Sequence, residues 1–405
     1  MTKRDESHQS ERRQFLKRAA YTGALGVAGT SSIANAATLS DDSLVVAQRQ
    51  PMPTRTLGRT GVDVPILHLG TSQSLDPTYD KVMHRCYKSG VTWFDTALSY
   101  GWGASHKAIA NFIEQIGDRK SLWLTSKSGD RDVDGLVADV DKALTELNTD
   151  YLDLYLMHGV RDARMLDKEY IRAGDRLRKS GKTTFFGFSC HNGNVVELLN
   201  KAAKVGGIDA ILFRYNFRRY GDRDLNLAID ACHKAGIGML AMKTMGSVPP
   251  ELETVANFQS KDFTLAQAKL KSVWADDRIA SVVSEMDSVR VTKENVAAAK
   301  TQKPLTVGEA HQLNRLAAMT AQYSCEGCSH FCEQAAGGGV AIADSLRFLM
   351  YYESYGKRAH ARDLYKGIPE GQRDAPQAAL AAAAAVCPQG IDIAQRLAQA
   401  QSRLA

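Results

Sequence analysis

The sequence predicts an α/β fold in which a (β/α)8 TIM barrel over residues 53–300 is followed by a small, mainly α-helical domain over residues 301–405. Three observations predict it. Eight short apolar runs alternate with amphipathic stretches, no GxGxxG motif follows the first run, and the alternation stops near residue 300. A closed barrel is therefore favoured over an open dinucleotide-binding sheet.

Each apolar run is short, as expected of a buried parallel strand. Between the runs, stretches such as 134–148 and 224–236 have the apolar period of helices that pack on a sheet. The segment 54–67 contains a Thr-Gly turn and indicates an initial hairpin at the bottom of the barrel. The eight predicted strands are 66–72, 92–97, 122–127, 152–159, 184–189, 210–216, 237–243 and 281–286.

The composition is that of an ordinary globular protein. Hydrophobic residues make up 44% of the 405 residues and charged residues 24%, which is enough apolar material for a large core. The formal net charge is +6, and part of it lies in the first 36 residues. Because no dense Lys/Arg block follows, nucleic-acid binding is not expected.

Residues 1–36 resemble a twin-arginine export signal. Arg12 and Arg13 stand together, an uncharged stretch follows over 19–40, and the small residues at 34–36 are typical of a cleavage site. The stretch has few large apolar residues, so no stable membrane span is expected. The sequence thus predicts a periplasmic mature chain that starts near Ala37. This pathway carries folded proteins, which allows a cofactor to be inserted before export.

Ionisable side chains stand at the ends of three successive predicted strands. Asp95 ends the second strand and Tyr100 follows it, Lys127 ends the third, and His158 ends the fourth. Since the C-terminal ends of barrel strands form one rim, we expect these four side chains to lie together. Each alone has an ordinary structural explanation, such as a helix cap or an ion pair, but the combination predicts an active site.

These residue types suit the reduction of a carbonyl group. Hydride addition leaves negative charge on the carbonyl oxygen, so a proton must be donated to it. A tyrosine has an ordinary pKa near 10, which is high for this task near neutral pH, and a neighbouring lysine ammonium is expected to lower it. An aspartate would keep the lysine charged, and a histidine would hydrogen-bond the substrate oxygen.

The segments FDTALSYG, LTSK, LDLYLMHG and GKTTFFGFS resemble the aldo-keto reductase family, and the similarity runs from about residue 53 to residue 299. The resemblance implies an NAD(P)H-dependent oxidoreductase that acts on a small-molecule carbonyl: an aldehyde, a ketone or a quinone-like compound. It also implies the roles within the tetrad. Tyr100 would be the general acid/base, Lys127 would tune its pKa, Asp95 would hold the lysine, and His158 would orient the carbonyl.

The resemblance implies NADP or NAD as cofactor, although the cofactor positions match unevenly. Glu285 stands where a lysine often meets the 2′-phosphate of NADP, and a carboxylate there would repel that phosphate. Arg290 or Lys293 could compensate, so the choice between NADP and NAD stays open. The implied cofactor-binding residues are Gly70, Thr71, Ser72, Ser189, Lys243, Thr244, Glu294 and Asn295.

Residues 301–405 resemble the two-cluster, ferredoxin-like extension of one branch of this family. In that pattern, the fourth cysteine of each run completes the cluster of the other run. The first run, SCEGCSHFC, lacks its own Cys-Pro, while the second has lost its three leading cysteines and keeps only its Cys-Pro. The surviving cysteines therefore all belong to one cluster and predict a single [4Fe–4S] site of Cys325, Cys328, Cys332 and Cys387.

Two other uses of these cysteines stay open, namely a zinc site and a pair of disulfides. Three residues separate Cys328 from Cys332 where two are usual, so the geometry of the site is also open. Two functions follow. The chain is an exported carbonyl reductase with a cluster in its tail, or it is a periplasmic iron–sulfur electron-transfer protein whose barrel docks a redox partner protein.

Overall fold

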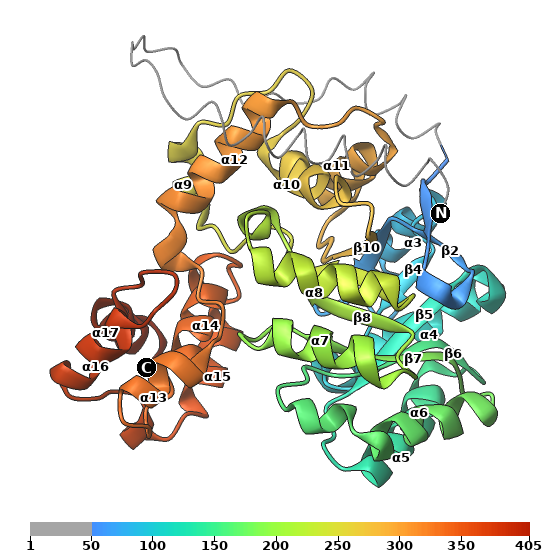
Figure 1. Cartoon of the computed structure of the whole chain (residues 1–405). Coiled ribbons are helices and arrows are strands. Elements are labelled where there is room, and N and C mark those ends of the chain that lie inside the picture. Colours follow the sequence, from blue (N-terminus) through green and yellow to red (C-terminus); the bar gives the residue numbers. More distant parts are fainter. Residues whose placement is uncertain (1–50) are drawn as a thin grey trace.

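The computed structural model describes residues 51–405, and its centre is a closed barrel of eight parallel strands (Figure 1). Each strand pairs with its neighbour in sequence, and the last strand closes on the first. The predicted TIM barrel is therefore confirmed. Its strands are β3 (Leu67–Gly70), β4 (Trp93–Asp95), β5 (Trp123–Ser128), β6 (Leu152–Met157), β7 (Thr183–Cys190), β8 (Ala210–Arg214), β9 (Gly238–Met242) and β10 (Ile279–Ser284).

Helices follow the strands and form the outer ring of the barrel (Figure 1). Aspartates at several helix starts satisfy backbone N–H groups that have no partner within the helix: Asp80 accepts from two at the start of α3, and Asp132 does the same for α5. The helices of the ring are α3 (Lys81–Lys88), α4 (Ala104–Ile116), α5 (Val133–Leu147), α6 (Lys168–Lys179), α7 (Val195–Val205), α8 (Arg223–Lys234), α10 (Leu265–Trp274) and α11 (Val289–Lys300).

The N-terminal hairpin covers the bottom of the barrel. Its strands β1 (Thr54–Thr56) and β2 (Asp63–Pro65) are antiparallel, and between them Leu57 is fully buried in the apolar interior of the barrel. The N–H of Arg59 donates to the carbonyl oxygen of Gly236, just before β9, at 2.6 Å. The hairpin therefore seals the N-terminal ends of the strands, as expected from the sequence.

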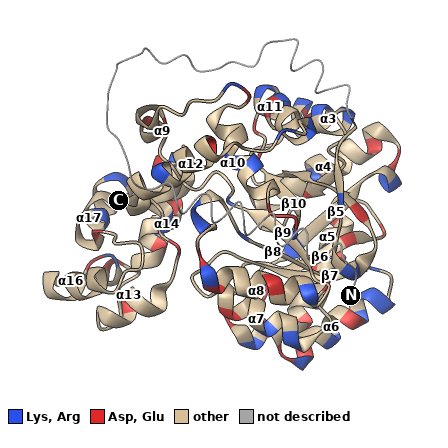
Figure 2. Ribbon diagram, turned by 45° about the horizontal axis from the view of Figure 1, so that its top comes forward, with Lys and Arg blue, Asp and Glu red and all other residues tan. Residues whose placement is uncertain are grey.

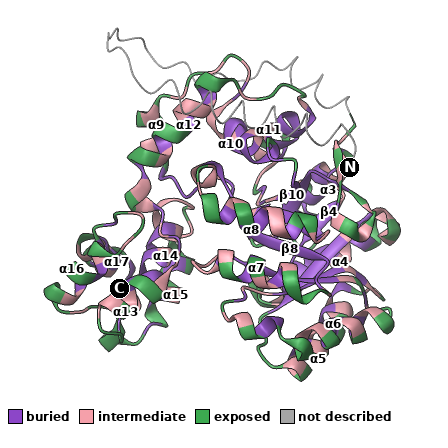
Figure 3. Cartoon of the chain, in the orientation of Figure 1, coloured by how far each residue is buried: buried purple, intermediate pink, exposed green. Residues whose placement is uncertain are grey.

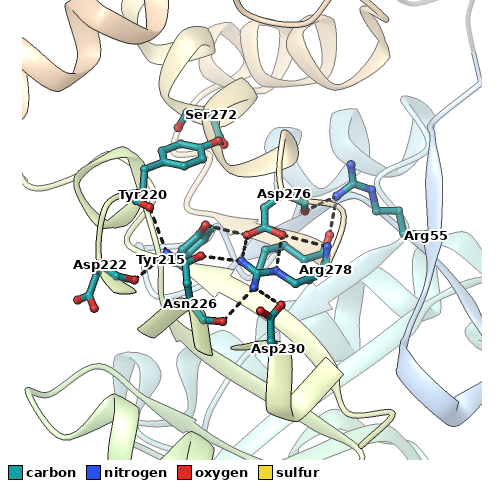
Figure 4. A network of polar contacts seen from close by, with 10 residues as sticks. Arg55, Tyr215, Tyr220, Asp222, Asn226, Asp230, Ser272, Asp276 and Arg278 are labelled. Carbon is teal, nitrogen blue, oxygen red and sulfur yellow. Dashed lines mark hydrogen bonds and ion pairs between the residues drawn. The ribbon is translucent and has the colours of Figure 1, made fainter. Parts of the chain in front are cut away.

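A polar network fastens this hairpin to the last strand (Figure 4). The guanidinium of Arg55 donates to the carbonyl oxygens of Asp276 (3.0 Å) and Ile279 (2.7 Å). The buried carboxylate of Asp276 accepts from Tyr215 Oη at 2.8 Å and from Arg278 Nη2 at 2.6 Å. Because Asp276 and Arg278 pair with each other, neither is buried as an uncompensated charge.

The main apolar core lies between the strands and the helix ring, and a second core fills the inside of the barrel. Figure 3 shows burial following the strands and the inward faces of the helices. Charges of both signs lie on the outer faces of barrel and tail (Figure 2). Within residues 51–405, no helix has the length and apolar character that crossing a membrane requires.

Beyond Lys300, where α11 ends, the chain forms only helices, which confirms the mainly α-helical character of the tail. Two apolar clusters hold the tail together, one around Cys332 and Ile342 and one around Phe348 and Tyr365. Figure 1 shows residues 329–404 as a lobe beside the barrel, whereas residues 307–319 pack against the barrel helix α10. The helices of the tail are α12 (Val307–Met319), α13 (Ser329–Ala335), α14 (Ile342–Glu353), α15 (Arg358–Lys366), α16 (Gln377–Ala385) and α17 (Ile393–Leu404). The predicted export signal, residues 1–36, lies outside the described residues.

Candidate active site

A buried ion pair marks the mouth of the barrel, which is the rim formed by the C-terminal ends of the strands. Lys127 Nζ on β5 lies 2.5 Å from Asp95 Oδ1 at the end of β4, and both residues are at most 3% exposed. The ammonium also donates to the carbonyl oxygen of Thr96 at 2.7 Å and lies 3.5 Å from Tyr100 Oη. The three side chains therefore form one connected group.

The strand register places the two charges together. Asp95 pairs with Thr125 across β4 and β5, and Lys127 follows two residues later on the same face of its strand. Thr71, after β3, supports the end of β4 because its N–H and its hydroxyl both donate to the carbonyl oxygen of Asp95 (3.0 and 2.9 Å). Hydrogen bonds from neighbouring strand ends thus hold the site in place.

Tyr100 begins a short turn that directs its ring back toward the pair. The turn needs left-handed backbone at Gly101 (φ 57°), Trp102 (φ 54°) and Gly103 (φ 90°), which glycine adopts at low cost. The edge of the Tyr100 ring meets the imidazole of His158 with 5.7 Å between ring centroids. The structure therefore brings together all four residues that the sequence predicts to act at the strand ends.

The electrostatics of the group differ in one respect from the expectation. Burial works against the charge of Lys127, but Asp95 and Tyr100 outweigh it and raise the lysine pKa, so the ammonium persists. Burial, with help from Lys127 and Arg131, lowers the pKa of His158 to about 3, so this imidazole is neutral. Burial also raises the pKa of Tyr100, because its effect exceeds that of the lysine 3.5 Å away. The phenol is thus held protonated, and the expected lowering of its pKa is absent.

Most of the predicted cofactor residues form hydrogen bonds within the chain. Ser189, at the end of β7, accepts from the N–H of Gly159 at 2.9 Å. On α11, Asn295 Nδ2 donates to Ser284 Oγ (2.9 Å), and Glu294 Oε1 accepts from Thr264 Oγ1 (2.6 Å). Gly70 is the last residue of β3, and the hydroxyl of Thr71 donates to the carbonyl oxygen of Asp95. The hydroxyl of the exposed Ser72 donates to the carboxylate of Glu285 at 3.2 Å, and Thr244 is buried after β9.

The tail contacts the mouth of the barrel, an arrangement that sequence reasoning missed. Lys357, which follows α14, forms an ion pair of 2.5 Å with Glu285. The predicted compensating cation Arg290 pairs instead with Glu294. Glu285 and Lys357 are 72 residues apart, and no local pattern links residues that only the docking of the tail brings together.

Two further contacts fix the tail on the barrel. Arg214, at the end of β8, donates to the carbonyl oxygen of Cys325 (2.9 Å) and to Glu326 Oε2 (3.1 Å), and both members of this ion pair are less than 10% exposed. Gly193 packs so tightly that a Cβ added to it would lie 2.2 Å from Cys328 Cα. The first cysteine run therefore lies directly against the strand ends.

The four tail cysteines line one cavity, although three come from residues 325–332 and the fourth is Cys387. The rest of its lining is mainly apolar and includes Phe331, Ile342 and Leu346. All seven cysteines of the chain are free thiols, so the structure does not form the two disulfides. Among residues 51–405, no three His, Cys, Asp or Glu side chains lie close enough to hold a single metal ion.

The structure thus has a closed parallel barrel with a protonated tyrosine beside a buried Lys–Asp pair at the strand ends. Residues 67–249 match the Aldo/keto reductase family. The match covers less than half of the chain and lies within the barrel, which is therefore similar to that family.

Curated relatives share the barrel at low identity. An uncharacterised oxidoreductase of Bacillus subtilis is 25% identical over 62% of this chain and 92% of its own length. The L-galactose dehydrogenase of Arabidopsis thaliana is 24% identical over 60% of this chain and 87% of its own. These matches cover less than two thirds of the chain.

Solved structures show the same fold. A Bacillus halodurans aldo-keto reductase in its holo form superposes with a TM-score of 0.57 at 22% identity, covering 65% of this chain and 96% of its own. A Klebsiella pneumoniae aldo-keto reductase in complex with NADPH gives a TM-score of 0.53 at 22% identity, over 65% and 95% of the two chains.

Proposed function

We propose that this protein is an exported oxidoreductase that reduces a carbonyl through Asp95, Tyr100, Lys127 and His158, and that its tail holds one [4Fe–4S] cluster. The observation that carries the reductase is the hydrogen-bonded group of Tyr100, Lys127 and Asp95 at adjacent strand ends in an aldo/keto reductase barrel. Alone, each contact has a structural explanation, whereas together they form a proton donor with a fixed cation behind it.

The side chains divide the work as follows. The neutral imidazole of His158 donates a hydrogen bond to the substrate carbonyl oxygen and orients it toward the phenol. Tyr100 donates its proton to that oxygen as negative charge develops there. Lys127, held charged by Asp95, stabilises the resulting phenolate. The product is the alcohol, and Tyr100 regains its proton from solvent.

A nicotinamide nucleotide, when bound, supplies the hydride. NADPH occupies the Klebsiella pneumoniae relative, and this supports NADP or NAD here. The nucleotide would contact the end of β3 (Gly70, Thr71, Ser72), Ser189, Thr244 and the pair Glu294–Asn295 on α11. These residues offer hydroxyl, amide and carboxylate groups, which can form hydrogen bonds with a nucleotide. Most of these groups already have internal partners, so binding would exchange those hydrogen bonds.

Removing the hydroxyl group of Tyr100 tests the proposed carbonyl reduction. Tyr100→Phe should lower the NADPH-dependent reduction of an aldehyde by at least about 100-fold, the range of general acid catalysis, while nucleotide binding persists. Tyr151→Phe is the matched control, because Tyr151 directly precedes β6 at the opposite end of the barrel. Steady-state kinetics and fluorescence titration with NADPH measure the two effects. If Tyr100→Phe reduces aldehydes at the wild-type rate, the proposed chemistry is wrong.

The cluster proposal rests on the common cavity of Cys325, Cys328, Cys332 and Cys387. A four-iron cluster is wider than one zinc ion, so its ligands must stand farther apart than those of a zinc site. Four free thiols that line one mainly apolar cavity offer the ligand type and number that such a cluster takes. The cluster would supply one-electron chemistry next to the barrel, while the thiolates and the cavity wall would hold it.

The position of this cavity also favours the second candidate function, an iron–sulfur electron-transfer protein whose barrel docks a redox partner. The first cysteine run lies directly against the mouth through Arg214 and Gly193. The Tyr100→Phe variant separates the two functions, because it should spare electron transfer through the cluster while it abolishes carbonyl reduction.

Export through the twin-arginine pathway is part of the proposal, and it rests on Arg12, Arg13 and the cleavage pattern at 34–36. Replacing both arginines by lysine keeps the charge but removes the motif. We expect the precursor to accumulate in the cytoplasm, whereas an Arg4→Lys control should reach the periplasm. Immunoblots of cell fractions measure this, and equal export of both variants would contradict the proposal.

A further inference from the structure

Lys243 is a partly buried cation for which no ion pair with a carboxylate forms within residues 51–405. It follows β9 at the mouth, in a left-handed backbone conformation (φ 59°). Its ammonium lies 4.9 Å from the ring centroid of Tyr351 and 5.0 Å from that of Tyr355, both from the tail. The groups that work against the burial of the ammonium and raise the pKa of Lys243 are phenols, namely Tyr351 and Tyr355 of the tail and Tyr100. Cation–π contacts keep an ammonium charged but leave it without a counter-ion.

The surroundings of Lys243 are positive as well. Burial lowers the pKa of His191, and the charges of Lys243, Arg214 and Arg347 lower it further. Arg214 is paired with Glu326 and Arg347 with Asp344, which leaves the charge of Lys243 in excess. The Nε atoms of Arg214 and Arg347 are both buried without a partner in the described chain. A partly buried cation that exceeds its counter-charges favours an anion beside it.

This region adjoins the catalytic group. Lys243 acts electrostatically on the phenol of Tyr100, and His158 acts on His191. Tyr100, His158, His191 and Lys243 each retain accessible surface. A molecule whose carbonyl meets Tyr100 and His158 thus has Lys243 within reach of its other end.

We propose that Lys243 binds a carboxylate on the substrate, so that the protein acts on anionic carbonyl compounds. This inference rests on the proposed reductase function and assigns Lys243 to the substrate rather than to the nucleotide. Tyr351 and Tyr355 position the ammonium, and the tail thereby takes part in substrate selection. No redox or covalent step is added, since the carboxylate is held and not transformed.

The test compares two aldehydes that differ in one charge, 4-formylbenzoate and its methyl ester. For the wild type, kcat/KM should be higher for the acid. Lys243→Met should lower the ratio of kcat/KM for the acid to kcat/KM for the ester by about tenfold or more, as expected for a lost hydrogen bond to a charged group. Lys243→Arg should restore the preference. Lys201→Met, on the outer helix α7, is the matched control.

Other outcomes overturn the proposal. If Lys243→Met raises the KM for NADPH and slows both aldehydes equally, the lysine binds a nucleotide phosphate. If it only lowers the melting temperature and keeps the preference for the acid, the lysine serves to anchor the tail.

A binding experiment separates this inference from the reductase function. Terephthalate is an unreactive dianion, and calorimetry on the full-length mature protein measures its affinity without turnover. Weaker binding to Lys243→Met by about tenfold supports the anion site even if no aldehyde is reduced. Absent binding to the wild type, or equal binding to both proteins, overturns it.

Discussion

At the scale of single residues, the Lys127–Asp95 pair determines the state of the site. Both groups are buried, and water does not replace a lost partner there. The pair holds the ammonium charged at 3.5 Å from Tyr100, yet burial still keeps the phenol protonated. The phenol is thus protonated at neutral pH, and its raised pKa makes the stabilisation of a phenolate by Lys127 more important for any proton transfer.

Asp95→Asn tests this pair. The change leaves Lys127 buried without its counter-charge, so we expect the free energy of unfolding to fall by about 3–5 kcal/mol and reductase activity to fall with it. Asp162→Asn is the control, because Asp162 pairs with Arg164 on the surface, where solvent screens the two charges. Urea denaturation measures both variants. Equal stability of Asp95→Asn and the wild type would show that the pair is not a buried charge interaction.

At the scale of elements, the tail joins the barrel through an apolar cluster that includes Leu313 and Leu316 of α12, and its first cysteine run makes close contacts with the strand ends. Gly193 follows β7, and the backbone of Cys328 lies where a side chain would be. Glu326 brings a buried carboxylate to Arg214 at the end of β8. One methyl group at Gly193 therefore suffices to displace the first cysteine run.

Gly193→Ala should weaken tail docking. The added Cβ would lie 2.2 Å from both Cα and Cβ of Cys328, so the tail must shift, and overpacking of this kind costs about 1–3 kcal/mol. We expect faster tryptic cleavage after residue 300 and less bound iron. Gly221→Ala is the control, since nothing lies within 4 Å of a Cβ at that position. Identical proteolysis of the two variants would argue against tight docking at Gly193.

At the scale of the whole molecule, the barrel strands could be predicted from the sequence because each one is encoded by a local apolar run. All eight strands have an apolar run of the right length, and the residues at their ends meet because a barrel brings successive strand ends to one rim. The partners of Glu285 and Lys243 could not be predicted, because they come from the tail. Likewise, the raised pKa of Tyr100 depends on burial, which a motif does not report.

The tail poses the last question at this scale, namely whether Cys387 closes one site with the three earlier cysteines. Metal binding to four thiolates is coupled to folding, so loss of one ligand should loosen the helices that the cavity joins. Cys387→Ala, purified anaerobically, should lose its broad visible absorbance and most of its iron, about four atoms per chain in the wild type. Cys232→Ala removes a buried thiol of α8 and should keep both the visible absorbance and the bound iron.

Metal analysis separates the alternatives. One zinc per wild-type chain would contradict the cluster. Iron retained by Cys387→Ala would contradict the role of Cys387 as a ligand. If the Cys387→Ala variant loses the iron–sulfur cluster, a cysteine more than 50 residues from the other three ligands is needed to hold the cluster in the tail.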